Sequence, residues 1–184
     1  MVIDLGTGDG RFVLAATSDR PDRLVVGVDA SAAAMAEASR RAAASPRRGG
    51  RPNALFVAAA AEALPPELDG LADRVTVHFP WGSLLRGLLG AEAAVIGGIA
   101  RVLRPGARLD LLLSVTGRDH GAGASPLDAK AIAALAPAFA SHGLELGQPR
   151  PATADEVAVT RSTWGKRLRA GAIRPAWSVH AHRS

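Results

Sequence analysis

The sequence contains no cysteine, and this absence excludes disulfide bonds and thiolate metal sites. It has no tyrosine and only three tryptophans and four phenylalanines, so a tryptophan outside the core would stand out. No apolar run approaches the roughly 20 residues that a membrane-spanning helix needs. The chain does not begin with a basic, then apolar, then small-residue leader. We therefore expect a soluble, cytoplasmic protein that uses neither a membrane nor a metal.

The net charge of +5 is concentrated near the C-terminus. Residues 1–149 carry fifteen basic and fifteen acidic side chains, whereas residues 150–184 carry seven basic and two acidic ones. A second basic cluster lies earlier, at Arg40, Arg41, Arg47, Arg48 and Arg51. These charges are compatible with a solvated surface or with two contact sites for nucleic-acid phosphates. Composition alone favours the solvated surface slightly.

Short apolar runs alternate with helical segments along the chain. We expect strands at 2–5, 24–28, 54–58, 75–79 and 108–115, and helices at 11–18, 32–44, 91–103 and 126–142. A turn is expected at 104–106, a loop at 119–125, and two closing strands, which could be antiparallel, at 144–146 and 177–182. The alternation predicts right-handed βαβ units and a mostly parallel sheet with helices on both faces. We find no repeat, and expect one doubly wound α/β domain over residues 1–184.

A glycine-rich turn follows the first expected strand, in the pattern Asp4-Leu5-Gly6-Thr7-Gly8-Asp9-Gly10. Glycines let the backbone turn tightly and approach a ligand at the carboxyl edge of such a sheet. The G-x-G-x-G spacing differs from the G-x-G-x-x-G fingerprint of dinucleotide-binding enzymes, and an acidic residue precedes it. Both details favour S-adenosylmethionine (SAM), which has no pyrophosphate to place at a helix N-terminus.

Two acidic residues extend this pattern. Asp29 lies nineteen residues after Gly10 at the end of the second expected strand, and it suits hydrogen bonding to both ribose hydroxyls of SAM. The alternative, an acid at a helix N-terminus, is the weaker interpretation at this position. Glu62, after the third strand, would lie beside the adenine ring, although without the rest of the pattern it would be read as a solvated loop residue.

Two of the three tryptophans lie in polar or glycine-containing segments. One is in Phe79-Pro80-Trp81-Gly82, where the fourth expected strand ends; the other is in Ser162-Thr163-Trp164-Gly165-Lys166-Arg167-Leu168, within the basic excess. A core position would be the default interpretation for either tryptophan alone. The polar surroundings weaken it, and favour two exposed stacking surfaces.

With these segments, the chain resembles the 16S rRNA adenine-N1 methyltransferases that confer kanamycin and apramycin resistance. The resemblance runs from Ile3 to about Arg174. Its first motif is generic, whereas Phe79-Pro80-Trp81-Gly82 together with the late Ser-x-Trp-x-Lys-Arg-Leu segment is specific. The resemblance implies a class I SAM-dependent methyltransferase fold, here a single domain without the family's N-terminal extension. It also implies SAM as cofactor and, as substrate, the decoding-site adenine in helix 44 of 16S rRNA within the 30S subunit.

The resemblance also assigns residues to roles. Trp81 and Trp164 would sandwich a flipped adenine, and the Pro80 backbone would help to fix it. The residues expected near the cofactor are Gly6, Thr7, Gly8, Asp29, Ala61, Glu62, His78, Ser83 and Ser162. The residues expected to contact RNA phosphates are Arg40, Arg41, Arg48, Lys166, Arg167 and Arg174.

The expected chemistry requires no general base, because adenine N1 is a neutral nucleophile with an available lone pair. Catalysis would come from positioning. Three other functions stay open from the residues. A small-molecule SAM methyltransferase needs no split basic surface, an oxidoreductase conflicts with the glycine spacing, and a non-catalytic SAM- or rRNA-binding protein would keep both motifs. We expect the protein to be a monomer.

Overall fold

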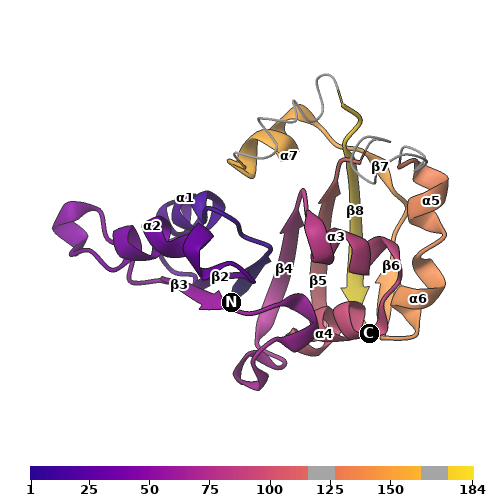
Figure 1. The fold of residues 1–184 in the computed structure, drawn as a ribbon, viewed down its shortest axis with the longest axis horizontal. Helices are drawn as coiled ribbons and strands as arrows, with labels where there is room; N and C mark the ends of the chain where they lie inside the picture. The colour runs from indigo at the N-terminus through magenta and orange to yellow at the C-terminus, as the bar shows by residue number, and fades with distance from the viewer. Residues whose placement is uncertain (116–126, 163–173) are drawn as a thin grey trace.

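The computed structural model describes residues 1–115, 127–162 and 174–184, which form one mixed sheet flanked by helices (Figure 1). The strand order is β3-β2-β1-β4-β5-β8-β6, with β7 also paired to β8. The five strands from β3 to β5 are parallel, whereas β8 runs antiparallel to β5, β6 and β7. The strands are β1 Val2–Leu5, β2 Val25–Asp29, β3 Ala54–Ala58, β4 Ala72–His78, β5 Leu103–Leu113, β6 Leu144–Leu146, β7 Arg150–Pro151 and β8 Trp177–Arg183.

The helices connect these strands and cover both faces of the sheet. They are α1 Arg11–Asp19, α2 Ala32–Ala42, α3 Gly82–Leu89, α4 Ala93–Val102, α5 Ala129–Ala133, α6 Ala136–Ala140 and α7 Ala154–Val159. Short 3-10 turns lie at η1 Pro46–Arg48, η2 Ala61–Ala63 and η3 Pro66–Leu68. The expected cap of α2 is present, because the Ser31 side chain accepts a hydrogen bond from the Ala34 amide.

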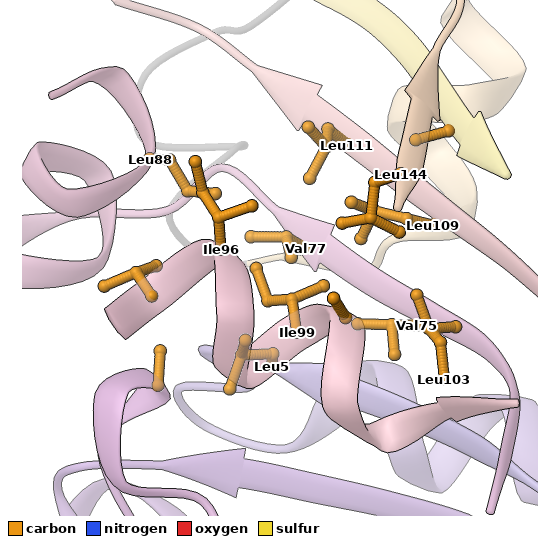
Figure 2. Close-up of a cluster of buried hydrophobic side chains, with 14 of the residues drawn as sticks. Leu5, Val75, Val77, Leu88, Ile96, Ile99, Leu103, Leu109, Leu111 and Leu144 are labelled. Carbon is orange, nitrogen blue, oxygen red and sulfur yellow. The ribbon is translucent and has the colours of Figure 1, made fainter. Parts of the chain in front are cut away.

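The main hydrophobic core lies between the sheet and α4 (Figure 2). Ile96 and Ile99 of α4 are fully buried against Val75 and Val77 of β4 and the leucines of β5. A smaller core on the other face packs α1 onto β1 and β2 through Val13. Since both faces of the sheet are covered, the predicted doubly wound arrangement is confirmed for the described residues.

Two expected elements differ from the structure, and two helices were not expected. The turn expected at 104–106 lies inside β5, where the pairing with β4 shifts register and Gly106 takes a positive φ of 77°. The helix expected over 126–142 is two helices in its described part, because Pro137 has no amide to continue the first one. Helices α3 and α7 were not expected at all. The loop expected at 119–125 lies outside the described residues.

Among the described residues, no single helix is both long and apolar enough to cross a membrane. Helices α3 and α4 reach the required length and composition only as a pair, and they meet at a bend of 97°. Most of the apolar side chains of α4 face the core of the sheet.

Candidate functional site

A cavity of about 770 Å³ opens at the carboxyl ends of β1, β2 and β4. This is the edge at which doubly wound folds bind their ligands. All nine residues expected near a cofactor line this one cavity: Gly6, Thr7, Gly8, Asp29, Ala61, Glu62, His78, Ser83 and Ser162. The lining also includes Pro80 and Trp81, so the described part of the expected adenine site opens into the same space.

The glycine turn after β1 shapes one wall of the cavity. Gly6, Gly8 and Gly10 have φ values of 74°, 57° and 69°, a region that side chains rarely adopt. A Cβ on Gly10 would come within 2.6 Å of the Ala38 Cβ, so that glycine allows α1 and α2 to approach. A Cβ on Gly8 would meet no protein atom within 4 Å, which leaves its backbone open to a ligand.

The carboxylate of Asp29 is fixed at the end of β2 by two backbone amides. Gly8 N donates to Oδ2 at 2.8 Å, and Ser31 N donates to Oδ1 at 2.8 Å. Each carboxylate oxygen has a further lone pair and can accept a second hydrogen bond. Asp29 is therefore set to accept from two neighbouring hydroxyls, as a ribose presents them.

The charges that line the cavity are acidic. Asp4, Asp9, Asp29 and Glu62 line it, and no lysine or arginine does so among the described residues. SAM carries a sulfonium and an ammonium, whereas a dinucleotide brings a pyrophosphate. The lining therefore fits SAM and opposes a dinucleotide. Glu62 lies in η2, which packs closely against α4 at Gly98. A Cβ on Gly98 would lie 2.3 Å from the Ala61 carbonyl oxygen, so a larger residue would push η2 away.

The segment after β4 turns sharply at Phe79, whose φ of 49° is unusual for a side chain of this size. Phe79 is buried, and its amide donates to Leu112 O at 2.8 Å. Pro80 and Trp81 follow this turn, and Trp81 is 49% exposed at the cavity. Trp81 is therefore a surface residue and not a core residue. Trp164 lies outside the described residues.

Thr160 and Ser162, just beyond the end of helix α7, also line the cavity. The N-terminus of α7 has a capping box, in which Thr153 and Glu156 bond reciprocally. Glu156 also accepts from both terminal nitrogens of Arg150, at 2.9 and 2.6 Å, and from Ser178 Oγ at 3.1 Å. These contacts fasten α7 to β7 and β8.

Glu156 is strongly held in its ionised form. The hydrogen bonds from Arg150 are the main reason that its pKa falls to about 2, and burial opposes this shift. The backbone of Thr153 and the Ser178 hydroxyl also lower the pKa. The carboxylate therefore remains charged throughout the neutral and mildly acidic range.

Some lining residues were missed by the sequence analysis. Phe12 lines the cavity from the first turn of α1, and Thr160 does so from the end of α7. The sequence holds a signal for the second, since Thr153-x-x-Glu156 is a capping-box pattern that marks the start of α7. The sequence holds no comparable signal for Phe12.

The expected RNA contacts fall on separate surfaces. Arg40 and Arg41 are exposed in the last turn of α2, and Arg48 is exposed in η1. Arg40 pairs with Glu37 at 2.7 Å. Arg174 is partly buried, and its Nη2 donates to Ser114 O at 3.4 Å. Lys166 and Arg167 lie outside the described residues.

Comparison with known proteins places the chain in one family. The family model described as "NpmA: 16S rRNA (adenine(1408)-N(1))-methyltransferase" matches residues 1–183. A 16S rRNA (adenine(1408)-N(1))-methyltransferase of Streptoalloteichus tenebrarius is 39% identical, covering 91% of this chain and 80% of the relative. An Escherichia coli protein of the same name is 27% identical, covering 98% of this chain and 85% of the relative.

Solved structures agree with this assignment. A tryptophan-to-alanine variant of the 16S rRNA (adenine(1408)-N(1))-methyltransferase from Catenulisporales acidiphilia, solved with the cosubstrate SAM, superposes with a TM-score of 0.88 at 31% identity. The match covers 99% of this chain and 84% of that one. The 16S rRNA methyltransferase KamB superposes with a TM-score of 0.87 at 38% identity, over 100% and 87% of the two chains. The chain therefore belongs to the NpmA family of 16S rRNA (adenine(1408)-N(1))-methyltransferases and has the class I SAM-dependent methyltransferase fold.

Proposed function

We propose that this protein transfers the methyl group of SAM to N1 of adenine 1408 in 16S rRNA, within the 30S subunit, and so gives resistance to kanamycin and apramycin. The observation that carries the proposal is the position of Trp81. This half-exposed indole lies on a rigid turn beside an acidic cavity that fits SAM. A flat aromatic surface at the methyl-transfer site suits a nucleobase better than a small flexible substrate.

The residues of the site have separate tasks in this reaction. Asp29 holds the ribose of SAM, while the glycine turn, Ala61, Glu62, His78, Ser83 and Ser162 surround the rest of the cofactor. Trp81 and Trp164 stack on the two faces of the flipped adenine, and the Pro80 backbone fixes its edge. Stacking contributes roughly 1–3 kcal/mol per base. Two such contacts offset the few kcal/mol that unstacking the base costs.

No residue needs to remove a proton. When bound, SAM supplies a methyl group whose bond to sulfur breaks as its bond to N1 forms, so the positive charge passes from sulfur to adenine. The protein therefore contributes geometry, and in-line positioning accounts for up to about 7–11 kcal/mol of barrier reduction. The same reasoning supports a reaction without a metal. We propose that a monomer suffices, acting in the cytoplasm where ribosomal subunits are found.

The test is calorimetry with SAM followed by methyl transfer to intact 30S subunits. We expect SAM binding and incorporation of one methyl group, mapped to adenine 1408 by a primer-extension stop. Subunits already methylated at this adenine by a relative serve as the matched control and should accept none. SAM binding without transfer would indicate a non-catalytic protein, and transfer to a small molecule alone would indicate a different methyltransferase.

A further inference from the structure

A buried polar network lies at the cavity floor, where β1 and β4 run side by side. Asp4 of β1 is paired in register with Thr76 of β4, and His78 follows two residues later on the same face of that strand. Asp4 and Thr76 are 2% and 0% exposed. The His78 side chain is 10% exposed. Asp4 and His78 both line the cavity, whereas Thr76 lies behind them.

The contacts of this network converge on one oxygen. Thr76 Oγ1 donates to Asp4 Oδ1 at 2.8 Å, and His78 Nδ1 lies 3.2 Å from the same atom. The imidazole contact has ion-pair distance without hydrogen-bond alignment, and Nδ1 has no other hydrogen-bond partner among the described residues. The ring of Phe12 meets the imidazole edge to face at 4.6 Å and limits its rotation.

The Asp4 carboxylate lacks a full countercharge within the protein. A buried carboxylate is costly unless it is paired and hydrogen-bonded. Within the described part of the chain, no lysine or arginine nitrogen lies within ion-pair distance of Asp4, and no residue donates a hydrogen bond to its Oδ2. A cation that reached Asp4 from the cavity would supply this countercharge. The α-ammonium of an amino-acid group has the required charge and three donors.

We propose that Thr76 and His78 form a brace that aims the Asp4 carboxylate at the α-ammonium of the methionyl group of SAM. Thr76 and His78 are positioning residues, because they act on the ligand through Asp4. The brace makes the site selective for adenosine ligands that carry the amino-acid group. This inference rests on the proposed SAM site, and it adds residues that set which part of the cofactor is recognised.

Binding of three ligands distinguishes a loss of the brace from a general disturbance of the cavity. SAM and S-adenosylhomocysteine both carry the α-ammonium, whereas 5′-methylthioadenosine retains the adenosine and the sulfur but lacks the amino-acid group. We expect Thr76→Val to weaken SAM and S-adenosylhomocysteine binding about tenfold, the scale of a lost hydrogen bond to a charged group. His78→Leu removes the imidazole nitrogen that lies 3.2 Å from the Asp4 carboxylate, and it should weaken the binding of the same two ligands. Binding of 5′-methylthioadenosine should stay within about twofold of the parent value. Calorimetry on the full chain measures all three.

Conservative and matched variants complete the experiment. His78→Asn places an amide nitrogen near the position of Nδ1, and Thr76→Ser keeps the hydroxyl, so both should recover most of the affinity. Thr17→Val removes another buried threonine hydroxyl, and His180→Leu removes the histidine that pairs with Asp110; neither position lines the cavity, and both variants should bind like the parent. If His78→Leu does not fold, the comparison of Thr76→Val with Thr76→Ser still tests the inference.

Each outcome decides the inference. Selective weakening of the two ammonium-bearing ligands, with recovery in His78→Asn and Thr76→Ser, supports the brace. Equal weakening of all three ligands, or unchanged SAM binding in both His78→Leu and Thr76→Val, overturns it while the proposed function stands. A parent chain that binds none of the three ligands overturns the proposed cofactor itself.

Discussion

The Asp29 carboxylate is oriented without a ligand, because a backbone amide donates a hydrogen bond to each of its two oxygens. We expect Asp29→Ala to weaken SAM binding at least tenfold, since each lost hydrogen bond to a charged acceptor is worth roughly 1.5–3 kcal/mol. Calorimetry measures the change. Asp22→Ala is the control, because Asp22 pairs with Arg20 on the surface and does not line the cavity. Unchanged SAM affinity in Asp29→Ala, or tighter binding of NADH than of SAM, would contradict the assignment.

Trp81 and Trp177 offer a matched comparison between a substrate surface and a structural residue. Trp81 is half exposed at the cavity, whereas the Trp177 indole packs against the main core and donates to Leu127 O at 3.0 Å. We expect Trp81→Ala to melt near the parent temperature and to bind SAM. Methyl transfer should fall roughly 5- to 150-fold, because a stacking contact of about 1–3 kcal/mol is lost.

Trp81→Phe should retain part of the activity, since a smaller ring still stacks. We expect the same pattern for Trp164→Ala and Trp164→Phe. Trp177→Ala should lose about 3 kcal/mol of stability, and with it roughly 6–12 °C of melting temperature. Thermal melting and transfer to 30S subunits, measured together, check these variants. An unfolded Trp81→Ala protein would show that Trp81 supports the fold.

At the scale of single residues, the sequence predicted those site residues that belong to short local motifs. The glycine turn, Asp29 and the Phe79-Pro80-Trp81 segment each lie at a strand end, and strand ends of a parallel sheet meet at one edge. Phe12 was not predicted, because the sequence of a helix does not show whether an apolar side chain faces a cavity or the hydrophobic core. The contact between His78 and Asp4 depends on the register between β1 and β4. The sequences of the two strands do not show this register.

Helix α7 is fastened to the sheet by Glu156, and this contact has a predictable pH dependence. The folded-state pKa of about 2 lies below the ordinary value of 4.5, so the ionised carboxylate stabilises the fold above about pH 4.5. The contribution is lost as the pH falls through about 2. We expect Glu156→Gln to cost about 1 kcal/mol at pH 7, discounted because the side chain is partly exposed.

This loss corresponds to a melting temperature about 2–4 °C lower than that of the parent. The difference should shrink between pH 4.5 and pH 2, as the parent carboxylate becomes protonated. Thermal melting of both proteins across this range provides the measurement. Glu145→Gln, an exposed residue of β6, should melt like the parent at every pH. A difference between Glu156→Gln and the parent that does not vary with pH would argue against an ionised Glu156 as the anchor.

The elements themselves were predictable where hydrophobic periodicity was strong. Three of the five parallel strands match their expected bounds to within one residue, because each is a short apolar run between turn residues. The fourth expected strand starts three residues earlier, at Ala72, and the fifth starts five residues earlier, at Leu103; charged side chains interrupt the apolar pattern in both strands. The long helix expected over 126–142 was wrong because alanine favours helix on both sides of Pro137 and conceals the break.

On the scale of the whole molecule, the exposed arginines of α2 and η1 lie beside β2 and β3 (Figure 1). Lys166, Arg167 and Arg169 of the basic C-terminal segment lie outside the described residues. Two basic clusters that lie far apart in the sequence suit a large folded RNA, which a small substrate would not require. The sequence showed the arginines of α2 and η1 but could not place them relative to the cavity, because their position depends on the strand order of the sheet.

If Arg40, Arg41, Arg48, Lys166, Arg167 and Arg174 contact phosphates, affinity for the 30S subunit must fall steeply with salt, because each contact releases counterions. We expect each substitution by alanine to reduce the slope of log affinity against log salt by about 0.7–0.9. Arg104→Ala is the matched control: Arg104 is exposed and pairs with Asp73 at 2.6 Å near the amino end of β5, away from the cavity. Its slope should equal that of the parent. Binding to 30S subunits over a salt series provides the slopes, and unchanged slopes in the Arg40, Arg41 and Arg48 variants would show that these are ordinary surface charges.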